Sequence, residues 1–335
     1  MNNANEIDIV MTWVDGNDPE WIKLFNKYSP NKIETNIDIN KSRYKDYGLL
    51  KYWFRSVELY APWVRKIHFI TNGQKPTWLN TDNPKLNWVK HEDYIPDQYL
   101  PTFSSHPIEL NFHLIKDLSE KFIYFNDDIF INNPINPNYF FKNGIPVMHA
   151  DASCKWIKYP YIFSHINYNV TQLINEEFKF DKVVKNKPSN WFMKNPLRCK
   201  IDNLFYCLHS YIPGFATQHQ ANPYLKQTFV EVWKRYFDSL DNTSMNKFRN
   251  INDINQYIFY YWQLCKNNFV PKGKNDRAYF VVSEKNYLSI KKTLFGKKYK
   301  VICLNDNDYE DSDLIYQKLI EDFEKKFPTK SSFEV

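Results

Sequence analysis

The first 130 residues alternate between short apolar runs and amphipathic segments, and this alternation restricts the fold more than any other feature of the chain. Apolar runs bounded by turn-forming residues predict strands at 7–14, 66–71 and 122–125. Helical spacing of apolar residues predicts helices at 46–60 and 105–118. This order of elements, in which strands and helices alternate, is typical of an α/β protein whose mainly parallel sheet is flanked by helices.

The pattern changes after residue 148. Residues 149–215 are rich in Tyr, Trp, Pro and Asn, which predicts an irregular insertion that could line a groove. Periodicity then predicts helices at 222–237 and 252–266, a strand at 300–304 and an amphipathic helix from Ser312 to Phe327. We therefore expect one domain over 1–335, made of an α/β core (1–148), the insertion (149–215), a second part of the core (216–310) and a C-terminal helix and tail (311–335).

Polar residues follow the predicted strands where each strand ends. They are Asp15 and Asp18, Asn72 and Gly73, and the pair Asp127 and Asp128. Ligands of open parallel sheets bind beyond the carboxyl ends of the strands, so these residues are candidates for a binding site. The acid pair by itself fits two interpretations, a solvated turn and a site where a divalent metal offsets the cost of burying carboxylates.

The composition of the chain restricts its possible binding partners only in part. The chain has 44 Lys and Arg against 38 Asp and Glu, a net charge of +6 that suits an anionic partner without choosing among them. No recognition-helix, zinc or base-stacking motif points to nucleic acid. Five cysteines without a C-x-x-C spacing predict neither a disulfide framework nor a thiolate zinc site. We expect a cytoplasmic protein and leave open a peripheral contact with the inner face of a membrane.

Four blocks of sequence carry a family resemblance. They are the run IDIVMTWVDGND at 7–18, segments within 55–128 that end in FIYFNDD, the residues His219, Pro223 and 248–250, and ICLND at 302–306. Their content and order resemble the conserved regions of the Stealth proteins, the sugar-1-phosphate transferases of bacterial capsule synthesis. That family also includes the animal lysosomal-enzyme N-acetylglucosamine-1-phosphotransferase. The resemblance implies a nucleotide-binding fold similar to glycosyltransferase-A or Rossmann folds.

The resemblance also implies roles for particular residues. It implies catalytic roles for Glu109, Asp128, His219 and Arg249. It implies that Asp127, Asp128 and Asp306 hold Mg²⁺ or Mn²⁺, and the strand-end residues Asp15, Asp18, Asn72 and Gly73 are then candidates for binding the nucleotide-sugar. A base of near-neutral pKa suits the acceptor hydroxyl, and His219 is favoured over Glu109.

Each of these residues also has an ordinary structural interpretation. His219 alone would more often be a surface or capping residue, and Arg249 alone a surface ion-pair residue. Glu109 lies in the first turn of a predicted helix, where the helix dipole favours an acid. Asp306 follows a strand, as turn residues often do.

The activity expected from the resemblance is transfer of a hexose-1-phosphate, most naturally an N-acetylhexosamine-1-phosphate, from a UDP-sugar to a phosphodiester-linked glycan with release of UMP. Two alternatives stay open, an inverting glycosyltransferase that releases UDP and a non-catalytic glycan-binding protein. Contact with the inner membrane or a capsule export complex is a further open expectation.

Overall fold

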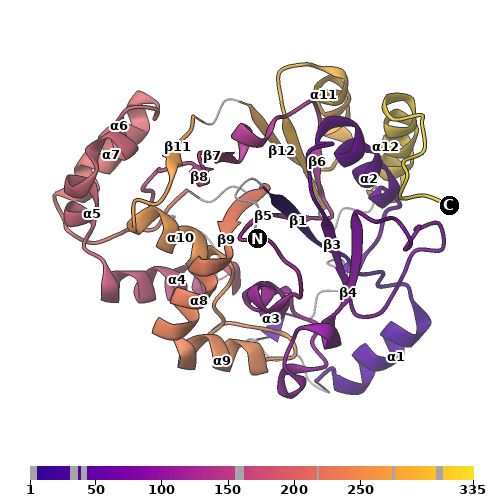
Figure 1. The fold of residues 1–335 in the computed structure, drawn as a ribbon, viewed down its shortest axis with the longest axis horizontal. Coiled ribbons are helices and arrows are strands. Elements are labelled where there is room, and N and C mark those ends of the chain that lie inside the picture. The colour runs from indigo at the N-terminus through magenta and orange to yellow at the C-terminus, as the bar shows by residue number, and fades with distance from the viewer. Residues whose placement is uncertain are drawn as a thin grey trace.

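A five-stranded sheet lies at the centre of the molecule (Figure 1). The computed structural model describes residues 6–30, 37–38, 44–154, 162–216, 219–273, 276–306 and 312–335. The strand order is β4 (Leu86–Lys90), β3 (Ile67–Thr71), β1 (Ile7–Thr12), β5 (Lys121–Asn126) and β9 (Asn222–Leu225). The first four strands are parallel, and β9 is an antiparallel edge strand. The predicted mainly parallel α/β sheet is confirmed.

Side chains of the central strands alternate between two hydrophobic cores. On β1, Ile9 and Met11 enter one core and Val10 enters the other; on β5, Ile123 enters the first core and Tyr124 the second. This period of two is the geometry of a strand covered on both faces. The elements that supply the first core are α2 (Leu50–Tyr60), α11 (Glu284–Phe295) and α12 (Ser312–Lys326). Helices of the second core include α3 (Ser105–Leu110), α4 (Ile162–Glu177), α8 (Lys226–Arg235) and α10 (Tyr257–Cys265).

A second, three-stranded sheet adjoins the end of β5. Its order is β12 (Arg277–Val281), β13 (Val301–Asn305) and β6 (Ile129–Ile131). Since β5 ends at Asn126 and β6 begins at Ile129, Asp127 and Asp128 form the turn that connects the two sheets. Further elements are α1 (Pro19–Tyr28), α9 (Phe237–Met245), and the short strands β2 (Ile37–Asp38), β7 (Phe141–Lys142), β8 (Ile145–Met148), β10 (Arg249–Asn250) and β11 (Val270–Pro271).

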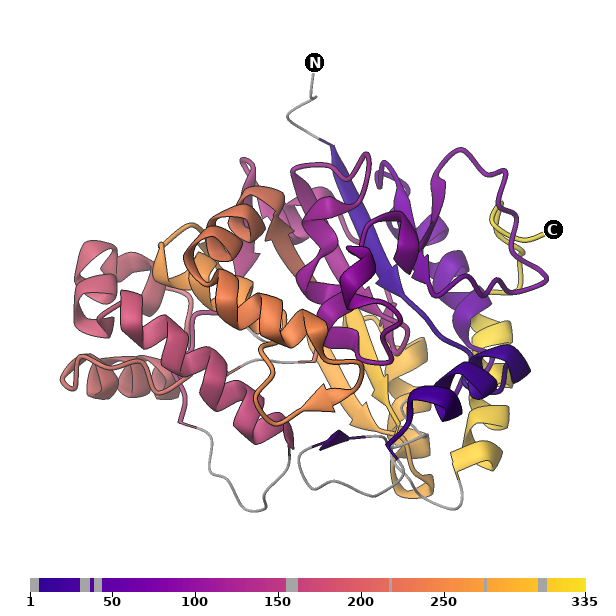
Figure 2. The same cartoon turned by 90° about the horizontal axis from the view of Figure 1, so that it is seen from below.

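The predicted irregular insertion is wrong for its described part, which is largely helical. It contains α4, α5 (Phe180–Asn186), α6 (Pro188–Phe192) and α7 (Leu197–Cys207), whereas 155–161 lies outside the described residues. Figures 1 and 2 both show α5, α6 and α7 at the end of the molecule opposite α12. On α4, Ile166, Val170 and Ile174 are buried at four-residue spacing. The polar residues between them obscured this stripe in the sequence.

Four predicted helices differ from the observed ones. Those predicted at 46–60 and 252–266 begin only at Leu50 and Tyr257. The helix predicted at 105–118 stops at Leu110, and Asp117 has a φ of 64°, a left-handed conformation that a continuing helix does not allow. The helix predicted at 222–237 begins only at Lys226, because Asn222–Leu225 pairs with the edge of β5. Pro223 is tolerated there because an edge strand need not donate at every residue. The C-terminal helix matches its prediction to within one residue.

Candidate active site

A pocket of about 980 Å³ opens at the turn that carries the acid pair. Strand β13 fixes the backbone of this turn, because the N–H of Leu304 donates to the carbonyl oxygen of Asp128 at 2.8 Å. Six of the predicted site residues line this pocket. They are Glu109, Asp127, Asp128, His219, Arg249 and Asp306.

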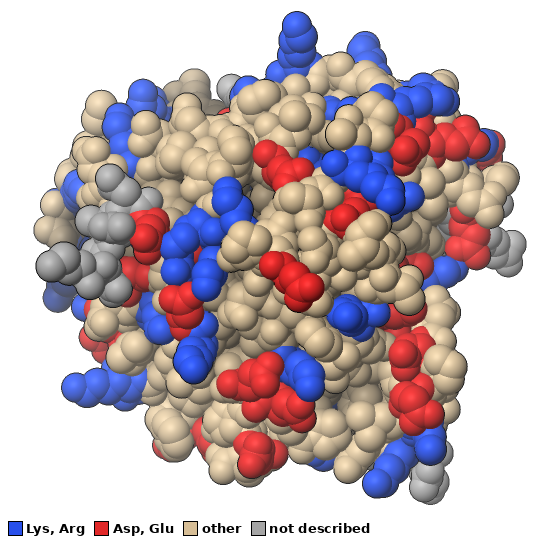
Figure 3. Space-filling view, turned by 45° about the vertical axis from the view of Figure 1, so that its right-hand side comes forward, with Lys and Arg blue, Asp and Glu red and all other residues tan. Residues whose placement is uncertain are grey.

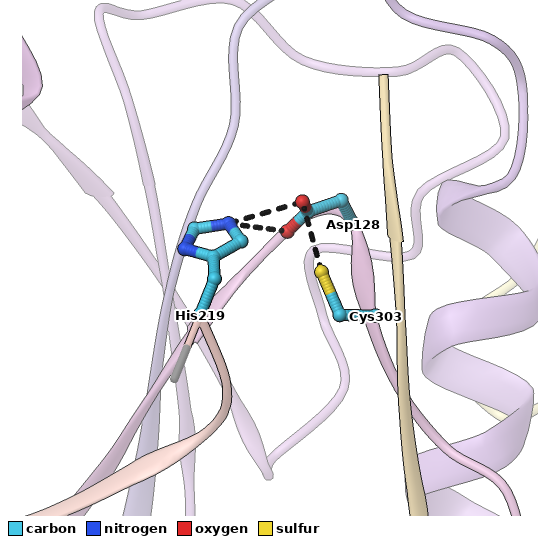
Figure 4. A group of neighbouring side chains, drawn as sticks. All are labelled: Asp128, His219 and Cys303. Carbon is cyan, nitrogen blue, oxygen red and sulfur yellow. Dashed lines mark hydrogen bonds and ion pairs between the residues drawn. The ribbon is translucent and has the colours of Figure 1, made fainter. Parts of the chain in front are cut away.

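His219 and Cys303 approach the carboxylate of Asp128 from different elements (Figure 4). The Nε2 atom of His219 lies 3.0 and 3.2 Å from the two carboxylate oxygens of Asp128, and the thiol of Cys303 donates to Oδ2 at 3.3 Å. A carboxylate only accepts hydrogen bonds, so Nε2 carries a proton, and in the neutral ring Nδ1 is then left to accept one.

The two partners shift each other's pKa. Burial alone would raise the pKa of Asp128, but the charge and hydrogen bond of His219, with help from Cys303, lower it. Burial alone would lower the pKa of His219, but Asp128, and then Glu109 and Asp127, raise it. Asp128 is therefore ionised at neutral pH and holds the His219 ring in one orientation.

Asp127 behaves differently from its neighbour. Burial, followed by the negative charges of Asp128 and Asp46, raises the pKa of Asp127 to about 8. Burial and the charge of Asp15 also raise the pKa of Asp46, which lines the same pocket. This side of the pocket thus holds more negative charge than the described side chains compensate, a condition that a bound cation would relieve.

Helix α3 positions Glu109. Its N-cap is Ser104, which accepts from the backbone N–H of His106 at 3.3 Å. The carboxylate of Glu109 is buried and accepts from the hydroxyl of Tyr124 at 3.1 Å. That hydroxyl also lies 3.2 Å from Oγ1 of Thr12, so hydrogen bonds of Tyr124 connect β1, β5 and α3.

Arg249 and Asp306 reach the pocket from β10 and from the end of β13. The Nη2 group of Arg249 donates to Oγ of Ser105 at 3.1 Å, and within the described part of the chain the other guanidinium donors have no hydrogen-bond partner. Asp306 accepts from the hydroxyl of Tyr47 at 2.5 Å, and the Tyr47 ring stacks on Tyr316 with a centroid distance of 3.6 Å.

The four predicted nucleotide-sugar residues are not among the described residues that line the pocket. Asp18 caps α1 by accepting from the N–H of Trp21 at 2.7 Å, and Asp15 accepts from the N–H of Asn17. Asn72 accepts weakly from the N–H of Gln74 at 3.4 Å, and Gly73 has a φ of +106°, a conformation that favours glycine. These residues shape turns.

Two pocket residues were missed in the sequence. Arg277 on β12 is buried, and its Nε and Nη2 have no hydrogen-bond partner among the described residues. Its Nη1 lies 3.5 Å from the carbonyl oxygen of Ala221. Oε1 of the buried Gln220 also lacks a partner in the described part of the chain. No local motif marks either residue. Arg277 is placed by the pairing of β12 with β13, and Gln220 contacts β12 only in the folded chain, where its Nε2 donates to the carbonyl oxygen of Ala278 at 3.1 Å.

The donor set fits Mg²⁺ or Mn²⁺ better than zinc. Asp128, His219 and Cys303 bring ligand atoms within 4.8 Å of one another, a group that would suit zinc if the thiol were ionised. Burial, followed by the charge of Asp128, raises the pKa of the Cys303 thiol well above its usual value, so it acts as a hydrogen-bond donor. The remaining candidates are oxygens, which are the ligands that Mg²⁺ prefers. They are supplied by Asn126, Asp127, Asp128, Asn305 and Asp306.

Comparison with known proteins shows to which family the chain belongs. The family models for Stealth conserved region 1 and Stealth conserved region 2 match residues 5–33 and 43–148. The capsular polysaccharide phosphotransferase WcwK of Streptococcus pneumoniae is 41% identical over 338 residues, which cover 100% of this chain and 99% of WcwK. The chain belongs to the Stealth family. It is accordingly an enzyme of the phosphotransferase class.

Other relatives of this Stealth protein have similar names. The receptor polysaccharide phosphotransferase WefC of Streptococcus oralis is 34% identical over 99% of this chain and 100% of its own length. The exopolysaccharide phosphotransferase cps2G of Lactiplantibacillus plantarum is 35% identical over 98% of this chain and 96% of its own. Among solved structures, the galactosyltransferase LgtC in complex with donor and acceptor sugar analogues covers 97% of this chain and 98% of its own, with a TM-score of 0.41 and 11% identity. That similarity is too low to bear on the reaction.

Proposed function

We propose that this Stealth protein transfers a hexose-1-phosphate, in particular an N-acetylhexosamine-1-phosphate, from a UDP-sugar to a hydroxyl of a phosphodiester-linked glycan and releases UMP. The observation that carries the proposal is the gathering of an oriented histidine, Asp128 beside it, and the guanidinium groups of Arg249 and Arg277 in one pocket. These are the groups that attack on a diphosphate requires: a base for the hydroxyl and cations for the phosphoryl oxygens.

His219 is the base in this proposal. As the acceptor oxygen attacks the β-phosphorus of the donor, Nδ1 of His219 takes the hydroxyl proton and Nε2 keeps its hydrogen bond to Asp128. The bond from the β-phosphorus to the bridging oxygen breaks, and the electron pair leaves on UMP. The charge of Asp128 stabilises the imidazolium that forms, as a carboxylate next to a catalytic histidine does in other enzymes.

Arg249 and Arg277 are the phosphate-binding residues in this proposal. A guanidinium matches two oxygens of a phosphoryl group, and Nε and Nη2 of Arg277, which have no hydrogen-bond partner among the described residues, gain partners when such a group binds. Asp127, together with Asp128 and Asp306, would hold Mg²⁺ or Mn²⁺. A bound ion would offset the negative charge of the diphosphate.

A label on the β-phosphorus of the donor tests the proposal. Purified protein is incubated with UDP-N-acetylhexosamine carrying ³²P at the β-position, Mg²⁺ and acceptor glycan. Phosphotransfer moves the label into the glycan. Label that stays entirely on released UDP, with the sugar in the product, would establish glycosyl transfer in its place.

A further inference from the structure

Helix α7 presents an apolar stripe to solvent. The stripe consists of Leu197, Ile201, Leu204, Phe205 and Leu208, whose exposed fractions lie between 54% and 77%. At about 100° per residue, these five side chains fall within a sector roughly 100° wide, the width of a face that normally packs against another surface. The opposite side of α7 already packs against the rest of the protein, because Cys199 and Asn203 are buried.

Basic residues border the stripe. Lys200 lies on one side of the sector and Arg198 on the other, and Arg198 is paired only loosely with Asp202 at 3.9 Å. Long cationic side chains in this position extend toward charged headgroups while the apolar residues between them enter the hydrocarbon boundary.

The surrounding segment holds nearly all of the net charge of the protein. Residues 179–211, which comprise α5, α6 and α7 with their connections, contain seven Lys or Arg and two Asp or Glu. The rest of the chain has 37 Lys or Arg and 36 Asp or Glu. On the face drawn in Figure 3, basic and acidic side chains are intermixed. A net +5 thus accompanies the exposed stripe.

We propose that α7 is a membrane-docking helix that lies in the headgroup region of a bilayer containing anionic lipid. An acidic polysaccharide would match the charge but gives no apolar surface for five large hydrophobic side chains. A second copy of this chain would bring the same net +5 to the contact and would be repelled by it. A bilayer with anionic lipid supplies both the apolar layer and the negative charge. Among the described residues, no helix is long and apolar enough to cross a membrane, so the contact is peripheral.

The test is sedimentation of the whole protein with vesicles. The vesicles contain phosphatidylcholine alone or with 30% phosphatidylglycerol. We expect binding to the anionic vesicles that 0.5 M NaCl abolishes. The double substitution Leu204→Glu with Phe205→Glu weakens binding by roughly 30-fold or more, and Arg198→Glu or Lys200→Glu weakens it by about fivefold for each charge removed.

A matched control comes from α11, where Leu288 and Phe295 are 75% and 49% exposed. Leu288→Glu with Phe295→Glu removes the same residue types from a different helix and leaves vesicle binding unchanged. Circular dichroism and activity on soluble donor and acceptor verify that both double variants are folded. Three results would overturn the proposal: absence of wild-type binding, binding that salt does not affect, or a wild-type dimer that the α7 variant dissociates.

Discussion

Nε2 of His219 lies 3.0 Å from Oδ2 of Asp128, although 91 residues of sequence separate them. The strand-turn-strand unit of β5 and β6 brings the aspartate to the pocket, and the segment before β9 brings the histidine. Because β9 pairs with β5, the two side chains meet wherever this sheet forms. The fold therefore brings the two residues of the pair together.

Removal of the Asp128 charge should change the pH profile as well as the rate. The charge of Asp128 raises the pKa of His219, and the unprotonated imidazole is the base, so activity increases as pH rises through that pKa. In Asp128→Asn the pKa of His219 falls and the acidic limb of kcat/KM moves to lower pH, with a rate loss of about 100-fold or more. Steady-state kinetics from pH 5 to 9 measure both effects. Asp82→Asn, at an exposed turn, is the control. An unmoved limb in Asp128→Asn would remove His219 from the role of base.

Asp127→Asn should alter stability only at higher pH. The pKa of Asp127 is raised to about 8, so the folded protein binds this proton more tightly than the unfolded chain does. The stabilisation is complete below pH 4 and is lost as pH rises to 8. Without metal, wild type and variant should unfold at similar temperatures at pH 4, whereas the variant should be more stable at pH 8. Scanning fluorimetry in EDTA measures this.

The same variant tests metal binding. Mg²⁺ offsets the charge of ionised Asp127, so it should raise the unfolding temperature of the wild type at pH 8 and should raise that of Asp127→Asn much less. Equal Mg²⁺ effects on the two proteins would place the ion elsewhere.

Arg277 should strengthen binding of the donor and lower the stability of the folded protein. Two of its buried nitrogens lack partners in the described structure, and unsatisfied buried donors destabilise a fold by about 1–3 kcal/mol. Arg277→Met should therefore raise the donor KM about tenfold or more and leave the unfolding temperature unchanged or higher. A purely structural arginine would give the opposite result, a lower unfolding temperature with an unchanged KM.

Arg55 secures the C-terminus to α2. Its Nε and Nη2 donate to the two carboxylate oxygens of Glu334 at 2.8 Å each, and Nη1 donates to the carbonyl oxygen of Phe327 at 2.7 Å. Both side chains are almost completely buried. Arg55→Met leaves the Glu334 carboxylate without its cation and should lower the free energy of unfolding by about 3–5 kcal/mol in urea titrations. Lys23→Met, at an exposed position on α1, should change it by less than about 1 kcal/mol.

Local patterns predicted the elements that position the acid pair. The apolar run before Asp127 and the run before Asp306 both form strands, and both acids line the pocket. Glu109, His219 and Arg249 were found through family resemblance, because each alone has an ordinary structural explanation.

Contacts between distant parts of the chain could not be predicted. Asp15 and Asn72 follow adjacent parallel strands, and the side chain of Gln74 donates to the Asp15 carbonyl at 2.8 Å and accepts from the Asp15 N–H at 3.0 Å. These hydrogen bonds connect the ends of β1 and β3, and the role of Asp15 and Asn72 in binding the nucleotide-sugar stays a prediction. Arg277 was missed because its burial is visible only after β12 has paired with β13. Helices α4 to α7 were missed because polar and aromatic residues mask their buried positions.

The nucleotide released by the purified enzyme tests the central claim most directly. With UDP-N-acetylhexosamine, Mg²⁺ and acceptor glycan, chromatography of the products should show UMP in equal amount to the sugar incorporated, and Asp128→Asn should release little of either. Stoichiometric UDP, with UMP absent, would contradict the account.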